Sequence, residues 1–380
     1  MSARLCNDAS VVPDLALLLS RVGLDPSGWE PTEVAHNRWL TPAIWLLRRG
    51  DERIALKWLS ARRDMGATAW EGHWTANSDG PQRWNYWARE ALAYEHGITE
   101  TFASSGLAAP PCIGVDISDD DAVLALSFVD GIGGEHWTID DYAGAAQALG
   151  RAQAPYLCGE PLPKHGWLTA RFLREYTTDK PVDWSLLDDD RAWDQPLVRD
   201  CFPTELRAAA IELHRQRDRL FEIAQGLPTT LCHLDFWSKN LIRGSDGSFV
   251  LLDWAFVGTG AVGEDIGNLV PDAAFDHFVA SADLPALDEA VFDAYVVGLE
   301  EGGWTEDRQL VRLGVLASAV KYDWLTPLML AHASAARQVR YGGMDEDIDA
   351  VFRFRERGEA LLFNARRAAV ALDLADQLGR

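Results

Sequence analysis

Three oxygen-bearing side chains in the middle of the chain have types and spacing suited to phosphoryl-transfer chemistry. Asn240 comes five residues after Asp235, and Asp253 ends the apolar run 250–252. A carboxylate such as that of Asp235 can orient an attacking hydroxyl, and positioning is the main requirement of this reaction. Asn240 and Asp253 offer the hard oxygen ligands that Mg²⁺ prefers. Each residue alone could be a turn or cap residue, but the combination predicts a Mg²⁺-assisted phosphoryl-transfer site.

Two further residues are expected to hold the loop around Asp235 in place. His233 lies two positions earlier, and we expect it to pack and hydrogen-bond within the loop without acting as an acid or base. Asp265 follows Asp253 by twelve residues. It is expected to accept hydrogen bonds from backbone amides of the catalytic loop. A helix N-cap explains Asp265 equally well.

Lys57 lies inside the apolar segment 53–59, in a chain that contains only five lysines. A buried ammonium must be paired, because leaving it without a partner costs several kcal/mol. We expect Lys57 to contact the phosphates of a nucleotide and to pair with a helix glutamate. Glu90 is the first choice for this partner and Glu95 the second. The alternative is a lysine on an edge strand whose ammonium reaches solvent.

The order of the segments predicts an α+β protein with two lobes, 1–130 and 131–380. The small N-terminal lobe combines a sheet with a helix, and the larger C-terminal lobe is mainly helical. Two regions are expected to be irregular insertions, 60–83 and 155–202. The expected strands and helices are a hairpin at 43–59, a helix at 84–96, strands at 112–117 and 122–129, helices at 140–153, 203–225, 286–301, 305–334 and 346–378, and a β patch at 229–256.

The formal net charge of −23 makes nucleic acids and anionic membranes poor partners, since both are polyanions. An acidic surface could attract a cationic substrate or simply keep the protein in solution. The five cysteines are scattered without paired spacing, which fits a reducing compartment. No signal peptide or membrane-spanning run is recognised, so we expect a cytoplasmic protein. No obligatory protein partner is evident from the sequence.

The two central motifs resemble those of the aminoglycoside phosphotransferase and choline kinase-like family. Residues 233–240 resemble its catalytic loop, residues 252–254 resemble its metal-binding segment, and Asp265 matches its later structural aspartate. The resemblance extends over residues 31–335. It implies a protein-kinase-like fold in which ATP binds in the cleft between the lobes.

The small lobe shares in this resemblance. Lys57 and the Arg89-Glu90 pair resemble the family's nucleotide-lobe ion pair, and residues 127–131 resemble its hinge. The resemblance implies that the Ser127 carbonyl and the Val129 amide meet the adenine. From the residues alone, this segment could equally be an ordinary strand end.

Two features depart from the family pattern. The loop 36–42 contains no glycine, although glycine usually lets the amides of such a loop approach phosphates closely. Arg38 or Thr41 could take over this contact. The insertion between Lys57 and Glu90 is also long and could contact the substrate or act as a lid.

The sequence therefore predicts a kinase that uses ATP, or another nucleoside triphosphate, with Mg²⁺ to phosphorylate a hydroxyl of a small molecule. An aminoglycoside, another amino sugar or an amino alcohol would fit the acidic charge. The alternative is a nucleotide-binding pseudokinase or scaffold. Carboxylates and aromatic rings of the C-terminal lobe would suit a cationic acceptor; the candidates are Asp188, Asp189, Asp190, Asp272, Asp276 and Trp324.

Overall fold

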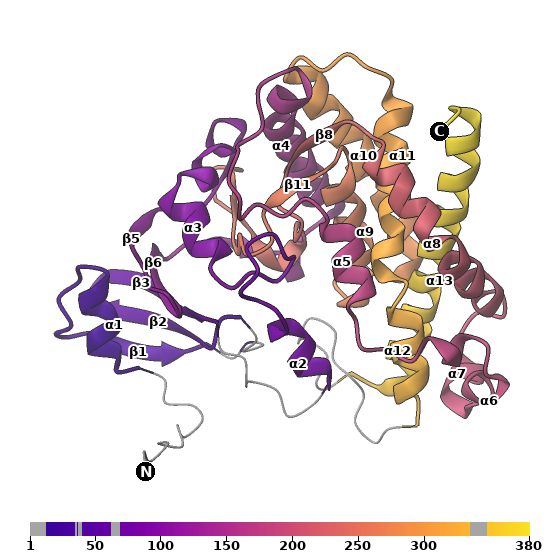
Figure 1. Cartoon of the computed structure of the whole chain (residues 1–380), viewed down its shortest axis with the longest axis horizontal. Helices are drawn as coiled ribbons and strands as arrows, with labels where there is room; N and C mark the ends of the chain where they lie inside the picture. Colours follow the sequence, from indigo (N-terminus) through magenta and orange to yellow (C-terminus); the bar gives the residue numbers. More distant parts are fainter. Residues whose placement is uncertain (1–12, 35, 37–39, 62–68, 335–347) are drawn as a thin grey trace, which may run out of the picture.

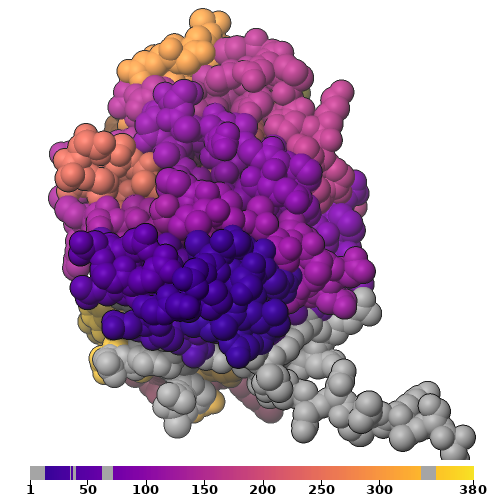
Figure 2. Space-filling model, turned by 90° about the vertical axis from the view of Figure 1, so that its left-hand side faces the viewer, coloured from indigo at the N-terminus to yellow at the C-terminus, as the bar shows by residue number. Residues whose placement is uncertain are grey.

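The computed structural model describes residues 13–34, 36, 40–61, 69–334 and 348–380. The chain folds into a smaller lobe built on a five-stranded sheet and a larger, mainly helical lobe (Figure 1). Figure 2 shows the face on which the small lobe lies, with the indigo N-terminal residues packed against the purple and magenta residues that follow them in the chain. The predicted two-lobed α+β architecture is confirmed. The lobe boundary at residue 130 stays a prediction.

The sheet of the small lobe is antiparallel, with the strand order β1-β2-β3-β6-β5. Gly50 has a φ of +61° in the turn between β2 and β3, which suits a residue without a side chain. The predicted hairpin is therefore present. The strands are β1 Glu30–Glu33, β2 Ala43–Arg49, β3 Glu52–Ser60, β5 Cys112–Ile117 and β6 Asp121–Ser127.

Strand alternation directs Lys57 toward the helix that carries its partner. Successive side chains of a strand point to opposite faces of the sheet. Leu56 and Trp58 of β3 pack in the cluster that contains α1 (Leu15–Arg21), whereas Leu59 packs in the core that contains α3 (Arg89–Glu95). Lys57 shares the face of Leu59 and thus projects toward α3.

The large lobe is organised around a close pair of helices, α4 and α10. Gly150 and Gly298 lie where the two backbones approach each other. The α-helices outside the small lobe's α1 and α3 are α2 Ala69–Thr75, α4 Ile139–Leu157, α5 Phe172–Thr178, α6 Asp190–Trp193, α7 Pro196–Cys201, α8 Leu206–Gln225, α9 Glu264–Phe275, α10 Leu284–Glu301, α11 Arg308–Ala317, α12 Leu325–His332 and α13 Ala350–Gln377.

Two small sheets take the place of the single β patch expected at 229–256. In one, β8 (Thr229–Cys232) pairs with β11 (Gly258–Ala261). The other has the order β4-β10-β9-β7, with β4 Leu107–Ala108, β10 Phe249–Leu251, β9 Leu241–Arg243 and β7 Ile132–Gly133. The loop from β8 to β9 carries Asp235 and Asn240, and the loop from β10 to β11 carries Asp253. The strands of the two small sheets therefore flank both predicted motifs and fix the two ends of each loop.

The segment before Glu90 differs from the expectation. The helix predicted at 84–96 begins only at Arg89, because turns precede it, including a hydrogen bond from the Trp87 amide to the Ser78 carbonyl (3.1 Å). The expected irregular insertion 60–83 contains a short helix, α2. Within the described part of the chain, no helix has the length and apolar character needed to span a membrane.

The Gly150–Gly298 crossing yields a prediction about stability. A Cβ on Gly298 would lie 2.1 Å from the backbone oxygen of Gln147, so the two helices would have to separate. We expect Gly298→Ala to lower the free energy of unfolding by about 2 kcal/mol or more, measured by urea denaturation. Gly72→Ala is the control, because Gly72 is helical and a Cβ added there would have nothing within 4 Å. Equal stability of both variants would contradict the close-packing interpretation.

Candidate active site

The ion pair between Lys57 and Glu90 joins the sheet of the small lobe to α3. The Lys57 Nζ lies 2.7 and 2.8 Å from the two carboxylate oxygens of Glu90, whose side chain is fully buried. Burial disfavours the Lys57 ammonium, but the carboxylates of Asp253 and Glu90 outweigh this effect and raise the pKa of Lys57. The first choice of partner is therefore the one that the structure brings together with Lys57. Glu95 instead lies 3.6 Å from His96 at the surface.

Asp253 approaches this ion pair from the large lobe. Its Oδ1 lies 3.9 Å from the Lys57 Nζ, and its side chain remains 43% exposed. Asp253 has a φ of +58°, in the left-handed region that few residues other than glycine, asparagine and aspartate adopt. The next residue, Trp254, is fully buried and donates its indole N–H to the Leu251 carbonyl (3.0 Å). Its backbone N–H interacts with Glu90, so the turn at Asp253 is held from both lobes.

Asp235 and Asn240 are held together across the catalytic loop. The Asn240 Nδ2 donates to the Asp235 Oδ2 at 2.8 Å and to the Asp235 carbonyl at 3.1 Å. The Leu252 amide donates to the Asn240 carbonyl at 2.7 Å, which ties this loop to the one that carries Asp253. Burial raises the pKa of Asp235 to about 7, with Lys321 acting against the shift and Asp253 adding to it.

His233 packs as expected, but neither ring nitrogen has a partner with hydrogen-bond geometry among the described residues. It is fully buried and its ring meets the Trp254 ring edge to face, with centroids 5.1 Å apart. Burial lowers the pKa of His233 to about 4, so the imidazole is neutral near pH 7. The ring therefore packs the catalytic loop against the Asp253 turn.

Asp265 accepts hydrogen bonds from the backbone of the catalytic loop. The amides of His233 and Leu234 donate to its two carboxylate oxygens at 3.0 and 2.7 Å. Gly263, and not Asp265, is the N-cap of α9. Burial raises the pKa of Asp265 to about 6, although these amides oppose the shift. These contacts fit the bracing role and not the alternative N-cap.

Two residues that the sequence did not single out extend this bracing network. The Gln153 Nε2 donates to the Asp265 Oδ2 at 2.9 Å and to the Leu231 carbonyl at 3.0 Å. The Tyr295 hydroxyl donates to the Gln153 Oε1 at 2.5 Å. Gln153 lies in the Ala-rich helix α4, where no local pattern marks it. The α4–α10 pair thus positions Asp265, which in turn positions the catalytic loop.

Asn240 and Asp253 fit a divalent metal by their donor chemistry. Asn240 uses its amide nitrogen for Asp235, which leaves the amide oxygen to face a cation. Asp253 contributes a partly exposed carboxylate. No group of three His, Cys, Asp or Glu side chains suited to a metal occurs among the described residues. A cation held here would complete its coordination with phosphate oxygens and water, as Mg²⁺ commonly does.

The hinge and the first loop are only partly defined. Ser127 ends β6, and Val129 lies between β6 and β7. Arg53 fixes this segment, because its guanidinium lies 4.4 Å from the Phe128 ring and it pairs with Asp130. The contacts of Ser127 and Val129 with adenine stay predictions. In the loop 36–42, Arg38 lies outside the described residues, and the Thr41 carbonyl is 2.6 Å from a ring nitrogen of His36.

The predicted acceptor residues do not form one group. Asp188, Asp189 and Asp190 are exposed; Asp189 caps α6, and Asp190 pairs with Arg207 at 2.7 Å. Asp272, Asp276 and Trp324 are buried in the large lobe. The charge of Asp272 contributes to raising the pKa of Asp235, which places Asp272 near the catalytic loop. Of the two sets, the buried one contains the residue that acts on Asp235.

The two insertions expected from the sequence have a shared structural role. Trp74, Trp84 and Arg83 come from the segment before α3, whereas Tyr176 and Asp179 come from the segment after α4. Ring contacts and the Arg83–Asp179 pair join the two segments. The two insertions therefore pack against each other and form one continuous piece of structure, not two independent loops.

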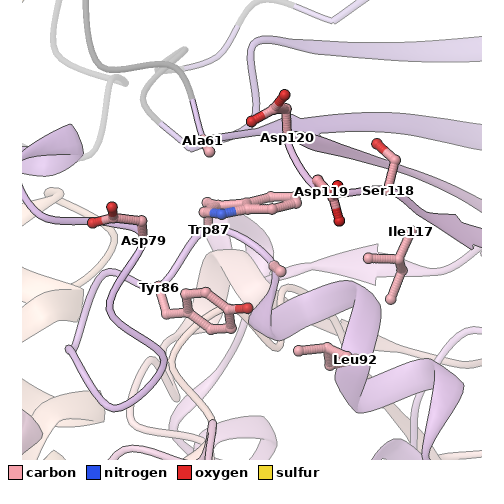
Figure 3. A pocket seen from close by; sticks show the side chains of 10 residues that line it. Ala61, Asp79, Tyr86, Trp87, Leu92, Ile117, Ser118, Asp119 and Asp120 are labelled. Carbon is pink, nitrogen blue, oxygen red and sulfur yellow. The ribbon is translucent and has the colours of Figure 1, made fainter.

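A pocket of about 300 Å³ lies elsewhere, beside the first turn of α3 and the turn between β5 and β6 (Figure 3). Its lining includes the rings of Tyr86 and Trp87 and the carboxylates of Asp119 and Asp120. None of the predicted site residues lines it. This pocket is therefore separate from the catalytic constellation.

Comparison with known proteins identifies similar sequences and folds. The sequence profile of the phosphotransferase enzyme family matches residues 41–310. No curated protein matches the chain significantly.

Solved structures resemble the chain in fold. Amicoumacin kinase hAmiN is 12% identical with a TM-score of 0.50, covering 87% of this chain and 87% of its own. Spectinomycin phosphotransferase APH(9)-Ia is also 12% identical with a TM-score of 0.50, covering 93% and 97%. Choline kinase from Cryptosporidium parvum is 13% identical, covers 96% and 95%, and has a TM-score of 0.48. The first two likenesses support the kinase-like fold.

The bracing role of Asp265 can be tested by substitution. In Asp265→Asn, one amide hydrogen of the loop would lose its acceptor, so we expect turnover to fall about 10- to 100-fold with nucleotide affinity nearly unchanged. The measurements are steady-state kinetics and calorimetric nucleotide binding. Glu264→Gln is the matched control, because Glu264 is equally buried but accepts from the Ala261 amide, away from the loop. Comparable losses in both variants would argue for general destabilisation.

The raised pKa of Asp235 predicts a pH dependence. Below a pH of about 7 the carboxyl is protonated and cannot take up the proton of a hydroxyl. We therefore expect kcat/KM to rise with pH through about 7 and to level off above it. A rate profile over a range of about pH 5 to 9 measures this. His233 has a pKa of about 4 and would not change its protonation within this pH range. A flat profile around pH 7 would disprove the assignment of this titration to Asp235.

Proposed function

This chain belongs to the phosphotransferase enzyme family and is an ATP-dependent small-molecule kinase that acts on a hydroxyl group. We propose that Asp235 orients that hydroxyl, while the residues around Asp253 hold the nucleotide and its metal. The observation that carries this proposal is the convergence of both lobes on one point. Lys57 lies 2.7 Å from Glu90 and 3.9 Å from Asp253.

Lys57 and Glu90 serve the nucleotide in this proposal. Glu90 fixes the Lys57 ammonium on the side of the sheet that faces the large lobe, so the ammonium can neutralise phosphate charge. Asn240 and Asp253 would hold Mg²⁺, which when bound neutralises the charge that develops on the phosphates. The Ser127 carbonyl and the Val129 amide would hydrogen-bond the adenine at the hinge.

Asp235 serves the acceptor. The hydrogen bond from Asn240 fixes one carboxylate oxygen and leaves the other for the hydroxyl. Because phosphoryl transfer passes through a loose transition state, alignment of the hydroxyl matters more than the strength of the base. His233 and Asp265 contribute by keeping this loop in one conformation.

The identity of the acceptor is the finer part of the proposal. The net charge of −23 favours an aminoglycoside, a related amino sugar or an amino alcohol. That charge belongs to the whole molecule and does not describe the surroundings of Asp235. An acceptor screen with Mg-ATP should therefore include cationic, neutral and anionic hydroxy compounds.

A nucleotide-binding protein without phosphotransfer is the second candidate. The glycine-free loop 36–42 favours it, because this loop lacks the residue that usually lets amides approach phosphates. The presence of Asp235, Asn240 and Asp253 together favours the kinase, since binding alone does not require all three.

Two substitutions distinguish these candidates. We expect Asp235→Ala to lower kcat by about 10²- to 10⁴-fold while Mg-ATP still binds, since only the hydroxyl contact is lost. Asp253→Ala should abolish turnover and also weaken Mg-ATP binding, because a metal ligand is removed. The measurements are ADP formation and calorimetric Mg-ATP binding.

Asp246→Ala is the control for both, because Asp246 lies in the exposed β9–β10 turn and, among the residues that the structure describes, its side chain bonds only to Ser248. Turnover like that of the unmodified protein in either active-site variant would refute the role assigned to that residue. Mg-ATP binding without any turnover of the unmodified protein would support the pseudokinase.

A further inference from the structure

The few lysines of this acidic chain gather around the catalytic loop. Lys180 and Lys321 are 3% and 2% exposed, although lysine is normally a surface residue. Lys239 lies in the loop itself, in the short helix η5 (Ser238–Asn240). Lys164 is the exposed exception. The interior of the site thus carries cationic groups that the overall charge of −23 conceals.

Lys321 is a buried ammonium without a close counter-ion among the described residues. It lies in η7 (Ser318–Tyr322), with its Nζ 5.3 Å from the centre of the Tyr176 ring and 5.6 Å from that of Phe172. Neither a hydrogen bond nor an ion pair of its side chain occurs within the described part of the chain. Its charge nevertheless acts on Asp235, and it is the strongest influence that lowers the pKa of that carboxyl. Since a desolvated ammonium needs an anion, this arrangement is suited to a charged ligand.

Lys180 occupies the place that a cationic substrate would otherwise take. Its Nζ lies 3.6 Å from the ring centre of Tyr176 and 4.0 Å from that of Trp74, with Trp84 and Trp324 at 5.0 and 5.1 Å. Such a box of aromatic faces binds ammonium groups. Burial and the charge of Lys321 lower the pKa of Lys180 well below its usual value. Because the chain fills the box with its own side chain, the box is closed to an ammonium of the acceptor.

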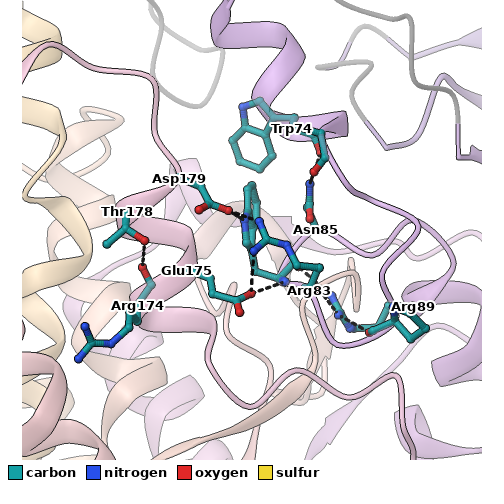
Figure 4. A network of polar contacts seen from close by, with 11 residues as sticks. Trp74, Arg83, Asn85, Arg89, Arg174, Glu175, Thr178 and Asp179 are labelled. Atoms are coloured by element: carbon teal, nitrogen blue, oxygen red, sulfur yellow. Dashed lines mark hydrogen bonds and ion pairs between the residues drawn. The ribbon is translucent and has the colours of Figure 1, made fainter.

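The protein around this aromatic box is rigidly connected. Asp179 accepts a hydrogen bond from the Trp84 indole (2.8 Å) and pairs with Arg83, whose other contact is Glu175 at 3.9 Å (Figure 4). These contacts hold α5 against the insertion before α3. Lys180 follows Asp179 directly and is therefore fixed in position beside Tyr176.

Tyr176 lies against both buried lysines and feels the charge of Asp235. Both Lys180 and Lys321 lie against its ring, at 3.6 and 5.3 Å. The charges of Asp235 and Asp272 act on the same tyrosine and, after burial, raise its pKa. An acceptor beside Tyr176 could therefore present a hydroxyl to Asp235 and an anionic group to the lysines.

We propose that Lys321, supported by Lys180, binds a carboxylate or phosphate group of the acceptor, so that this kinase phosphorylates an anionic hydroxy compound and not a polycation. This inference rests on the proposed function, because it concerns the acceptor side of the same site. It accounts for two lysine side chains buried beside Tyr176, one of which acts on Asp235, in a chain with a net charge of −23.

A matched set of acceptors tests the charge preference. Galacturonate, galactose and galactosamine share a sugar ring and differ in charge; glycerate and glycerol 3-phosphate separate a carboxylate from a phosphate. We measure binding of each by calorimetry with Mg²⁺ and a non-hydrolysable ATP analogue, and turnover by ADP formation. The acidic members should bind about 10- to 100-fold more tightly than their neutral analogues, the range of one charge-assisted hydrogen bond.

Variants assign that preference to Lys321. Lys321→Met should remove it, Lys321→Arg should retain it, and Lys164→Met, the exposed control, should leave it unchanged. Equal affinity for acidic and neutral members, tighter binding of galactosamine, or a preference that survives Lys321→Met would each overturn the proposal. Mg-ATP binding and its dependence on Asp253 are measured in the same samples. Loss of that binding would count against the proposed function, whereas intact Mg-ATP binding without acid preference would remove only the anion site.

Discussion

The buried ion pair between Lys57 and Glu90 is the interaction on which the site depends. An ammonium and a carboxylate removed from water are stable only with close geometry and further partners. Here the two Lys57–Glu90 contacts are 2.7 and 2.8 Å, and Asp253 and the Trp254 amide add contacts from the large lobe. The strand, the helix and the turn at Asp253 must therefore take fixed relative positions. The same pair that would hold phosphates also sets how the lobes meet.

Burial of carboxylates explains the electrostatics of the large lobe. Desolvation is the largest cause that raises the pKa of Asp235 and Glu264 to about 7 and that of Asp265 to about 6. Backbone amides and Gln153 oppose the rise in the pKa of Asp265, and Lys321 and Asn240 oppose the rise in the pKa of Asp235. The catalytic loop is thus positioned by groups that keep the charge of Asp265 tolerable. Asp235 is left with a pKa close to the working pH of most enzymes, which suits a group that receives a proton.

The sequence by itself determined the family, the two-lobed fold and the local placement of the motifs. The β2–β3 hairpin followed from Gly50 between two apolar runs, and the loop carrying Asp235 and Asn240 followed from residue types at short spacing. Such features are encoded locally, because each depends on a few neighbouring residues. Helix starts were less certain: α3 begins at Arg89 because distant contacts of the preceding turns replace its first expected turn. Arg89 itself donates to the carbonyls of Trp167 and Ala255 at 2.9 and 3.0 Å.

Only the tertiary structure decided which distant residues act together. It selected Glu90 over Glu95 as the partner of Lys57, because only Glu90 faces the sheet. It brought Gln153 and Tyr295 to Asp265 from two separate helices, and it buried Lys321 near Asp235. These relations join residues far apart in the chain, so no local period or composition records them. They exist because packing of the large lobe leaves each buried charge only the partners that the fold carries to it.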